Sequence, residues 1–315
     1  MALVLDATVK LGVTARLSTR EVIRRTVGLL EETGFQSLWA GDHIAFTSPI
    51  LDPMLGLSQA AALSDGVTVG TAVYLLPLRS AAAAAKLASS LDHLSDGRFI
   101  FGVGAGGEFP REFAACGVPL VERGRRMTEG IEVLRKLWSG RPVSHAGQIW
   151  RFDDVHMQPA PLTPGGPPIW CGGRSEAALR RAGRQGDGWI SYVVTPEQFA
   201  AGLATIETAR AEAGRATEPF GTGHLLFCRL DDSYERALDD ATALLSKRYA
   251  MDFRKAAQRY CGLGDPEAIA GTLRKFHAAG VRHFILDMLG TPEEREAQLR
   301  RFAKDVRPQI RDIAR

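Results

Sequence analysis

An aspartate and a histidine stand together at Asp42 and His43, directly after the short apolar segment Ser37–Ala40. The carboxylate could accept hydrogen bonds, and the imidazole could gain or lose a proton near neutral pH. These side chains could therefore carry acid–base catalysis. The structural alternative is that Asp42 caps the following turn while His43 packs against it, and the two residues alone do not decide between these interpretations.

A glycine-rich stretch, Gly102–Gly107, holds four glycines in six residues and is followed by Glu108. Glycine lets the backbone approach a ligand closely and exposes its amides to an anion. The stretch formally matches the G-x-G-x-x-G dinucleotide motif, but that motif belongs to the first strand–helix unit of a nucleotide-binding fold. Three other units precede this one. A tight turn without a ligand is the alternative.

A second candidate anion site is Gly172–Ser175, which leads straight into a predicted helix. Free amides and the helix dipole favour an anion at a helix N-terminus. Arg174 could add a bidentate contact. The alternative is that Ser175 simply caps the helix.

Other catalytic patterns are missing from the sequence. The seven histidines show no H-x-x-x-H spacing, no G-x-S-x-G elbow occurs, and the four cysteines form no C-x-x-C pair. We therefore expect no metal, no disulfide framework and a reducing, cytoplasmic environment. Glu108 and Glu112 lie one helical turn apart, and we interpret them as a charge pair at a helix N-terminus rather than as an acid–base pair.

The candidate sites follow short apolar segments, each of which is followed by a longer amphipathic one. Eight such units predict a closed (β/α)8 TIM barrel, whose active site lies at the carboxyl ends of the strands. The competing architecture is an open, doubly wound sheet. The predicted strands are Thr8–Val13, Ser37–Ala40, Val67–Val73, Arg98–Val103, Ile169–Cys171, Gly188–Val193, His224–Cys228 and Val281–Leu286.

The connections also carry predictions. Ser18 should cap the first helix, with Glu21 completing a capping box, and Thr195 should cap the helix that starts at Pro196. The Pro/Gly-rich segment 141–168 is too long for an ordinary connection, so it predicts an insertion after the fourth βα unit, either an ordered excursion or a lid. No linker divides the chain, so residues 1–315 should form one domain.

Composition narrows the class of protein. The chain has 315 residues, 45% of them hydrophobic and 24% charged, and a net charge of +3 that is spread along the chain. Nothing in this pattern calls for a nucleic-acid partner. No apolar run reaches the roughly 18 residues that a membrane span needs, and no secretory signal opens the chain.

The sequence resembles the luciferase-like monooxygenase superfamily, which includes flavin-dependent monooxygenases and oxidoreductases that use coenzyme F420, a deazaflavin. The resemblance covers about the first 190 residues in the family's order, and the last third matches only in its element pattern. The stretches that carry it are Glu31–His43, Gly70–Val73, Ala85–Arg98, Gly102–Gly106, Arg126–Trp138, Pro168–Ser175 and Gly186–Trp189.

This resemblance implies a cis peptide bond between Ala72 and Val73, against the middle ring of the flavin. It implies that Asp42 and His43 face the ring system and serve as the catalytic pair. The cofactor-binding set it implies is Asp42, Ala72, Val73, Gly104, Ala105, Gly106, Gly107, Glu108, Gly172, Gly173, Arg174 and Ser175.

Two residues depart from the family pattern. Some deazaflavin reductases carry serine where this chain has Ala72. Family members of one branch, which act on sugar phosphates, use an acidic residue of this region as the proton donor. This chain has an extra glycine, Gly107, which displaces Glu108 by one position from that residue and puts the role in doubt here.

Three functions follow from the resemblance. The first is hydride transfer between coenzyme F420 and a small organic substrate, which the continuation from Gly106 to Phe113 favours. The second is an FMN-dependent monooxygenase that uses molecular oxygen, and the third is a non-catalytic flavin-binding protein. Relatives commonly form homodimers, so we expect one. We expect the substrate pocket to include the loops after Trp39 and Ser191 and the segment 141–168.

Overall fold

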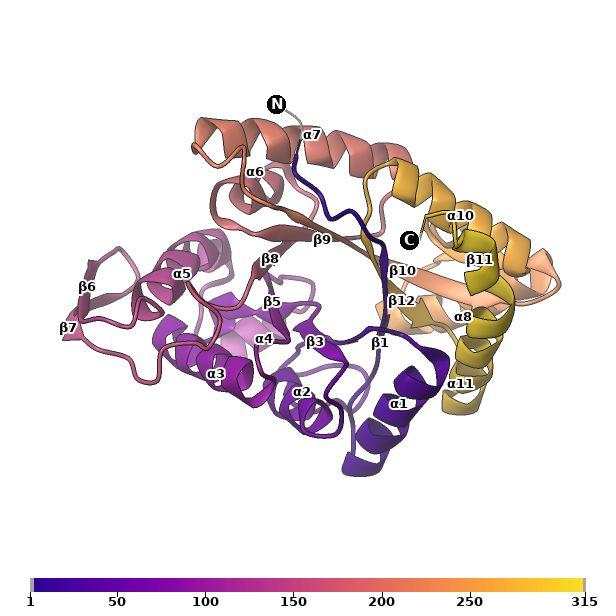
Figure 1. The fold of residues 1–315 in the computed structure, drawn as a ribbon, viewed down its shortest axis with the longest axis horizontal. Helices are drawn as coiled ribbons and strands as arrows, with labels where there is room; N and C mark the ends of the chain where they lie inside the picture. The colour runs from indigo at the N-terminus through magenta and orange to yellow at the C-terminus, as the bar shows by residue number, and fades with distance from the viewer. Residues whose placement is uncertain (1–2, 314–315) are drawn as a thin grey trace.

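The computed structural model describes residues 3–313 and forms a closed barrel of eight parallel strands (Figure 1). The pairing of β9 with β10 and of β12 with β1 closes the ring. The predicted TIM barrel is thereby confirmed and the open sheet excluded. In ring order, the strands are β1 (Lys10–Thr14), β2 (Ser37–Ala40), β3 (Thr68–Thr71), β5 (Phe99–Gly104), β8 (Ile169–Gly172), β9 (Gly188–Tyr192), β10 (Gly221–Leu230) and β12 (His283–Met288).

Helices surround this ring in Figure 1 and cover its outer face. In α3, Ala81, Ala84, Ala85 and Ala88 are buried at helical spacing, which shows how an alanine-rich face packs closely against the strands. The helices are α1 (Arg20–Thr33), α2 (Pro53–Ala61), α3 (Ala81–Leu94), α4 (Pro110–Ala115), α5 (Arg123–Leu137), α6 (Glu176–Gln185), α7 (Pro196–Glu212), α8 (Tyr234–Tyr249), α9 (Arg254–Tyr260), α10 (Pro266–Ala278) and α11 (Pro292–Arg301).

The first helix begins one residue later than its sequence predicts. Thr19, not Ser18, is the N-cap: its backbone is extended, and its hydroxyl accepts a hydrogen bond from the amide of Val22. The predicted capping box with Glu21 is therefore wrong, because the register of the first turn is shifted. The cap at Thr195 is confirmed and forms a complete capping box with Gln198.

The segment 141–168 contains a small antiparallel hairpin, β6 (Val143–Ala146) with β7 (Arg151–Val155), at the left edge of Figure 1. Glu129 of α5 accepts hydrogen bonds from the amides of Ile149 and Trp150 at 3.0 and 2.8 Å, which fastens the hairpin to the helix. This segment supplies no residue to the lining of the main cavity described below. The expectation that it builds the substrate pocket is therefore wrong.

Besides the two hairpin strands, two short strands were not predicted. Tyr74–Leu75 (β4) pairs with β5 just beyond β3, so the predicted third strand is interrupted at Thr71. Gly262–Gly264 (β11) pairs with the end of β10. Within residues 3–313, no helix is both long enough and apolar enough to cross a membrane.

The interior of the barrel is filled by large rings. Trp39 and Trp170 lie with their centroids 5.7 Å apart, and His283 meets the Trp39 ring edge-on at 5.2 Å. Burial lowers the pKa of His283 to about 3, so this histidine stays neutral and belongs to the core. The packed interior leaves the carboxyl ends of the strands as the place for a ligand.

Candidate active site

A cavity of about 870 Å³ opens at the carboxyl ends of the barrel strands. Its size falls in the range of small-molecule and cofactor sites, roughly 300–1,000 Å³. Every residue that the sequence placed in the site lies in its wall: Asp42, His43, Ala72, Val73, Gly104, Ala105, Gly106, Gly107, Glu108, Gly172, Gly173, Arg174 and Ser175. The barrel thus brings together four loops that are far apart in the sequence.

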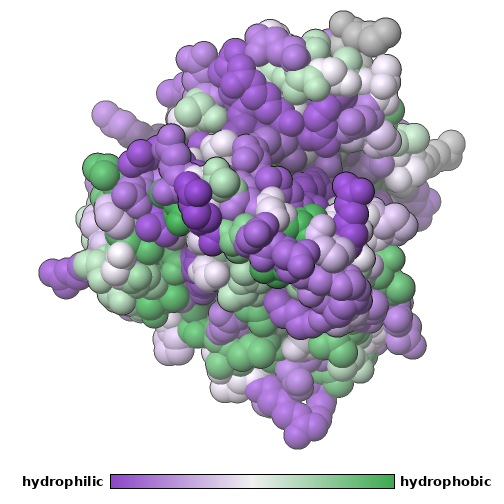
Figure 2. Space-filling model, turned by 90° about the vertical axis from the view of Figure 1, so that its left-hand side faces the viewer, coloured by the Kyte–Doolittle hydropathy of each residue, from purple (hydrophilic) through white to green (hydrophobic). Residues whose placement is uncertain are grey.

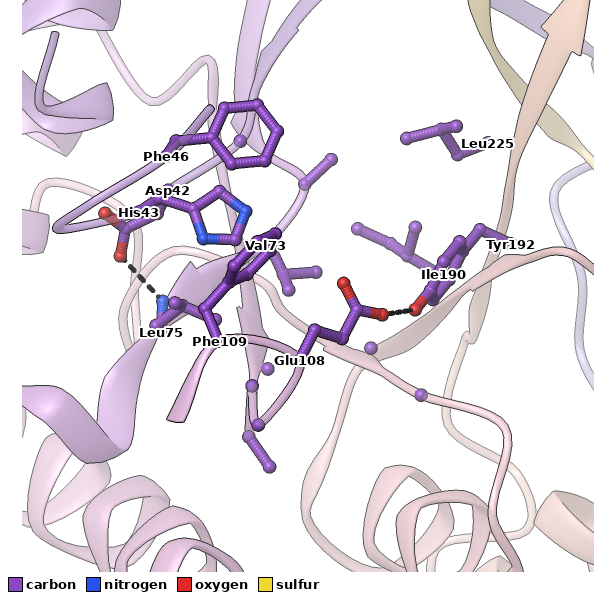
Figure 3. Close-up of a pocket in the computed structure, with 18 of the residues that line it drawn as sticks. Asp42, His43, Phe46, Val73, Leu75, Glu108, Phe109, Ile190, Tyr192 and Leu225 are labelled. Atoms are coloured by element: carbon purple, nitrogen blue, oxygen red, sulfur yellow. Dashed lines mark hydrogen bonds between the residues drawn. The ribbon is translucent and has the colours of Figure 1, made fainter. Parts of the chain in front are cut away.

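Val73 lies on the floor of this cavity, between the ends of β5 and β8 (Figure 3). The peptide bond between Ala72 and Val73 is cis, as the resemblance implied. A Cβ atom at Gly104 would lie 2.3 Å from Cγ2 of Val73, and one at Gly172 would lie 2.8 Å from Cγ1. Glycine is needed at both positions to admit the valine side chain, a reason that the sequence did not reveal.

Asp42 is fully engaged by its neighbours. Its carboxylate accepts the amide of Leu75 at 2.8 Å and both terminal nitrogens of Arg79, one of them at 2.8 Å. Burial raises the pKa of Asp42, while Arg79 and the amide oppose that effect. The carboxylate therefore anchors the segment after β3, and the structure gives it no free oxygen for acid–base work on a ligand.

His43 stands at the wall of the cavity with its ring partly exposed (Figure 3). Its Nδ1 lies 3.1 Å from one carboxylate oxygen of Glu112 and 3.2 Å from the other. The ring stacks on Phe46 at 4.3 Å and meets the edge of Phe109 at 5.1 Å. Because Nδ1 faces a carboxylate, Nε2 is the ring nitrogen available to a substrate.

Glu112 is the cavity residue whose position sequence reasoning misjudged. Its side chain, on α4, is buried, and one oxygen also accepts the amides of Ile44 at 2.6 Å and Ala45 at 2.9 Å. It therefore fixes both the loop after β2 and the histidine. The predicted charge pair with Glu108 is wrong, because Glu108 turns to the other side of the cavity and accepts a hydrogen bond from Tyr192 (Figure 3).

Tyr192 and Glu108 form a second polar pair across the cavity. Burial and the neighbouring carboxylate raise the pKa of Tyr192, so its hydroxyl remains a donor. The guanidinium of Arg174 lies 5.4 Å above the tyrosine ring and donates to the carbonyl of Val193 at 3.1 Å. Arg174 is thus held beside the cavity.

The end of the cavity near β5 and β8 is positively charged. Arg123 and Arg181 line it together with Arg174, although sequence reasoning named only Arg174. Arg181 donates to the hydroxyl of Thr128 at 3.0 Å, and burial lowers its pKa. Ser175 caps α6 by accepting the amide of Ala178 at 3.3 Å. Arginines and a helix N-terminus in one place favour an anionic group.

Residues 5–306 match the family described as luciferase-like monooxygenase. The chain belongs to this family. It is 31% identical to 4-hydroxyprotoasukamycin monooxygenase of Streptomyces nodosus subsp. asukaensis, over 67% of this chain and 59% of that relative. The match therefore spans less than two thirds of that relative's length.

Other family members match over more of their length. The chain is 26% identical to an F420-dependent glucose-6-phosphate dehydrogenase of Nakamurella multipartita, over 90% of each chain. Its fold superposes on the coenzyme F420-dependent tetrahydromethanopterin reductase of Methanopyrus kandleri with a TM-score of 0.80 at 19% identity, covering 97% of this chain and 100% of the other. The last likeness concerns the fold alone.

Because Asp42 anchors the segment after β3 through Arg79, we expect the protein to lose stability when Arg79 is replaced. Arg79→Met should lower the free energy of unfolding by about 3–5 kcal/mol, because it leaves a buried carboxylate uncompensated. Urea denaturation followed by circular dichroism measures this. The double variant Asp42→Asn/Arg79→Met is the control and should recover part of the loss. Equal stability of Arg79→Met and the natural chain would contradict the anchoring role.

Proposed function

We propose that this chain is an oxidoreductase that binds coenzyme F420 and transfers a hydride to or from a small organic substrate. The observation that carries the proposal is the His43–Glu112 pair, which lies in the same cavity as Val73 and the arginine-lined end. One relative described above, which is 26% identical to this chain, depends on F420 by name, and this supports the choice.

The residues fit such a coenzyme. Val73 and Ile190 offer an apolar floor for a flat ring system. The turns Gly104–Glu108 and Gly172–Ser175, with Arg123 and Arg181, would hold the phosphate end. We call these two turns and two arginines the phosphate seat. FMN also has a flat ring system and a phosphate, so the same residues would fit either coenzyme. Hydride donation or acceptance is the chemistry that the bound deazaflavin would supply.

His43 is the group that we propose to move the proton. Glu112 accepts from Nδ1 and so fixes one tautomer, which directs the Nε2 lone pair, or its proton, at the substrate. Phe46 and Phe109 cover the imidazole ring and limit the access of water to it.

A titration tests the choice of coenzyme. We expect the purified protein to bind coenzyme F420 at least tenfold more tightly than FMN, as measured by the change in cofactor fluorescence. Arg181→Gln is the control and should weaken both, because both ligands carry a phosphate. Tighter binding of FMN, with oxygen consumption in the presence of reduced FMN, would instead identify a monooxygenase.

Substitution of the proposed proton carrier tests the mechanism. With ketones and secondary alcohols screened for turnover, His43→Asn should lower kcat by roughly 10²–10⁴-fold, the usual worth of a general acid or base. Glu112→Gln should lower it less and shift the pH profile of kcat. Cofactor affinity should stay unchanged in both.

The control for this experiment is His93→Asn, since His93 lies on the exposed side of α3 and bonds the carbonyl of Ala160. Unchanged kcat in His43→Asn with the coenzyme still bound would remove His43 from the mechanism. If the wild-type chain bound the coenzyme and turned over no substrate of any class, it would be a non-catalytic flavin-binding protein.

We also propose that the chain forms a homodimer through α2 and α3. Leu55 on α2 and Leu94 on α3 are each 64% exposed, and Leu63 and Leu87 are exposed nearby in the sequence. Apolar residues gather in the lower half of the face in Figure 2, the half in which Figure 1 places both helices. Exposed apolar clusters of this kind mark protein interfaces.

Sedimentation velocity tests the dimer. The natural chain should sediment at twice the mass of one 34.2 kDa chain. The variant Leu55→Glu/Leu94→Glu should sediment as a monomer, because dimerisation would bury its new carboxylates in the interface. Leu244→Glu, which changes an exposed leucine of α8, is the control and should stay dimeric. A monomeric natural chain would refute the proposal.

A further inference from the structure

Three more arginines line the cavity on the side away from β5 and β8. Arg16 follows β1, Arg248 lies near the end of α8, and Arg295 lies on α11. In the ring order of the barrel, β12 stands opposite β5 and β1 stands opposite β8. These arginines therefore form a cationic group distinct from the one at the proposed phosphate seat, and the mechanism above does not use them.

One carboxylate, Asp287 at the end of β12, pairs with two of them. Arg248 donates to Oδ2 at 2.8 Å and Arg295 donates to Oδ1 at 2.6 Å. Asp287 is buried, which by itself would raise its pKa, but the two arginines lower it. Both oxygens of an ionised carboxylate are thus already bound.

Arg16 is the third cation. Arg16 lines the cavity but is exposed to solvent, and it donates to the neutral hydroxyl of Ser48 at 3.2 Å. Partial burial of its guanidinium and the like charges of Arg248 and Arg295 lower its pKa. Within the part of the chain that the structure describes, the buried Nε of Arg248 has no hydrogen-bond partner. Three guanidinium groups thus face one carboxylate, and a donor remains unused.

The surroundings do not neutralise this excess. Tyr249 shares a hydrogen bond with Arg248, and burial raises the pKa of Tyr249 to about 12, so the phenol stays neutral. Glu108, the other carboxylate that acts on Tyr249, is bonded to Tyr192. The apolar side chains of Leu17, Leu225 and Phe227 also line the cavity.

A purely structural role needs fewer arginines. One arginine can bind both oxygens of a carboxylate, as Arg79 does for Asp42. Gathering further cations beside a partly buried pair is costly unless an anion compensates them. An anionic ligand that enters the cavity would provide that compensation.

We propose that Arg16, Arg248 and Arg295 bind one anionic group of the substrate, a carboxylate or a phosphate. The substrate class is then a small organic acid or phosphate ester with an apolar body that contacts Leu225 and Phe227. Its reacting carbon would lie toward Val73, between this group and His43. This inference rests on the proposed function, because it names the substrate of the same site.

Calorimetric titration of the protein with its tighter-binding coenzyme already bound, so that the phosphate seat is filled, tests the inference. Benzoate, inorganic phosphate and the neutral benzamide are the probes, at constant ionic strength. We expect benzoate or phosphate to bind and benzamide not to bind. Arg16→Gln and Arg295→Gln should weaken anion binding at least tenfold.

Arg16→Gln is the decisive variant, because it leaves both ion pairs of Asp287 in place and should fold normally. Arg180→Gln, which removes an exposed pair with Glu212, is the control and should bind anions as the natural chain does. Binding of benzoate alone assigns a carboxylate, and binding of phosphate alone assigns a phosphate ester.

Absence of anion binding, equal binding of benzamide, or full binding by Arg16→Gln would overturn the inference. A failure of the proposed function would instead be seen in the coenzyme titration, as a lack of coenzyme F420 binding. If neither coenzyme binds, the same benzoate titration on the protein alone still compares the natural chain with Arg16→Gln and so reports on this group separately.

Discussion

The site depends on the space that the ends of β5 and β8 leave for one valine. Val73 occupies positions where a side chain on Gly104 or Gly172 would have to lie, so the cavity floor exists only because both strands end in glycine. These strands are hydrogen-bonded neighbours, with Val103 opposite Cys171, which places the two glycines side by side. Replacing either glycine would displace Val73 and, with it, the surface on which a ring system would rest.

Buried carboxylates set the positions of the loops above this floor. Asp42 holds the segment after β3 through Leu75 and Arg79, and Glu112 holds the loop after β2 together with His43. In both cases the carboxylate bonds several partners from other elements, which rigidifies groups on different loops relative to one another. Asp287 differs, because the cations around it outnumber it. Two carboxylates therefore build the site, whereas the third leaves positive charge for a ligand.

The sequence predicted the features that depend on neighbouring residues, namely the strands and the turns at their ends. Apolar runs ending in Gly or Asp located the strand ends, and the barrel rule then placed Asp42, His43 and the glycine turns in one cavity. The cis bond at Val73 came only from the family resemblance. The contact of Glu112 with His43 joins residues 69 apart, and no periodicity encodes it. Arg16, Arg248 and Arg295 come from three separate elements, and their convergence appears only once the ring closes. The single domain over 1–315 and the cytoplasmic location stay predictions.

The arrangement of charge limits how two ligands could share the cavity. Positive groups lie on opposite sides of the barrel mouth, and the lining between them includes the apolar side chains of Val73, Ile190 and Leu225. Two anionic ligands repel each other least when their charged groups are farthest apart. A coenzyme anchored at Arg123 and Arg181 and a substrate anchored at Arg16 would therefore meet through their uncharged parts over the apolar floor. His43 stands at the wall of that space, so the side chain that we propose to carry the proton would lie beside the atoms that the two ligands bring together.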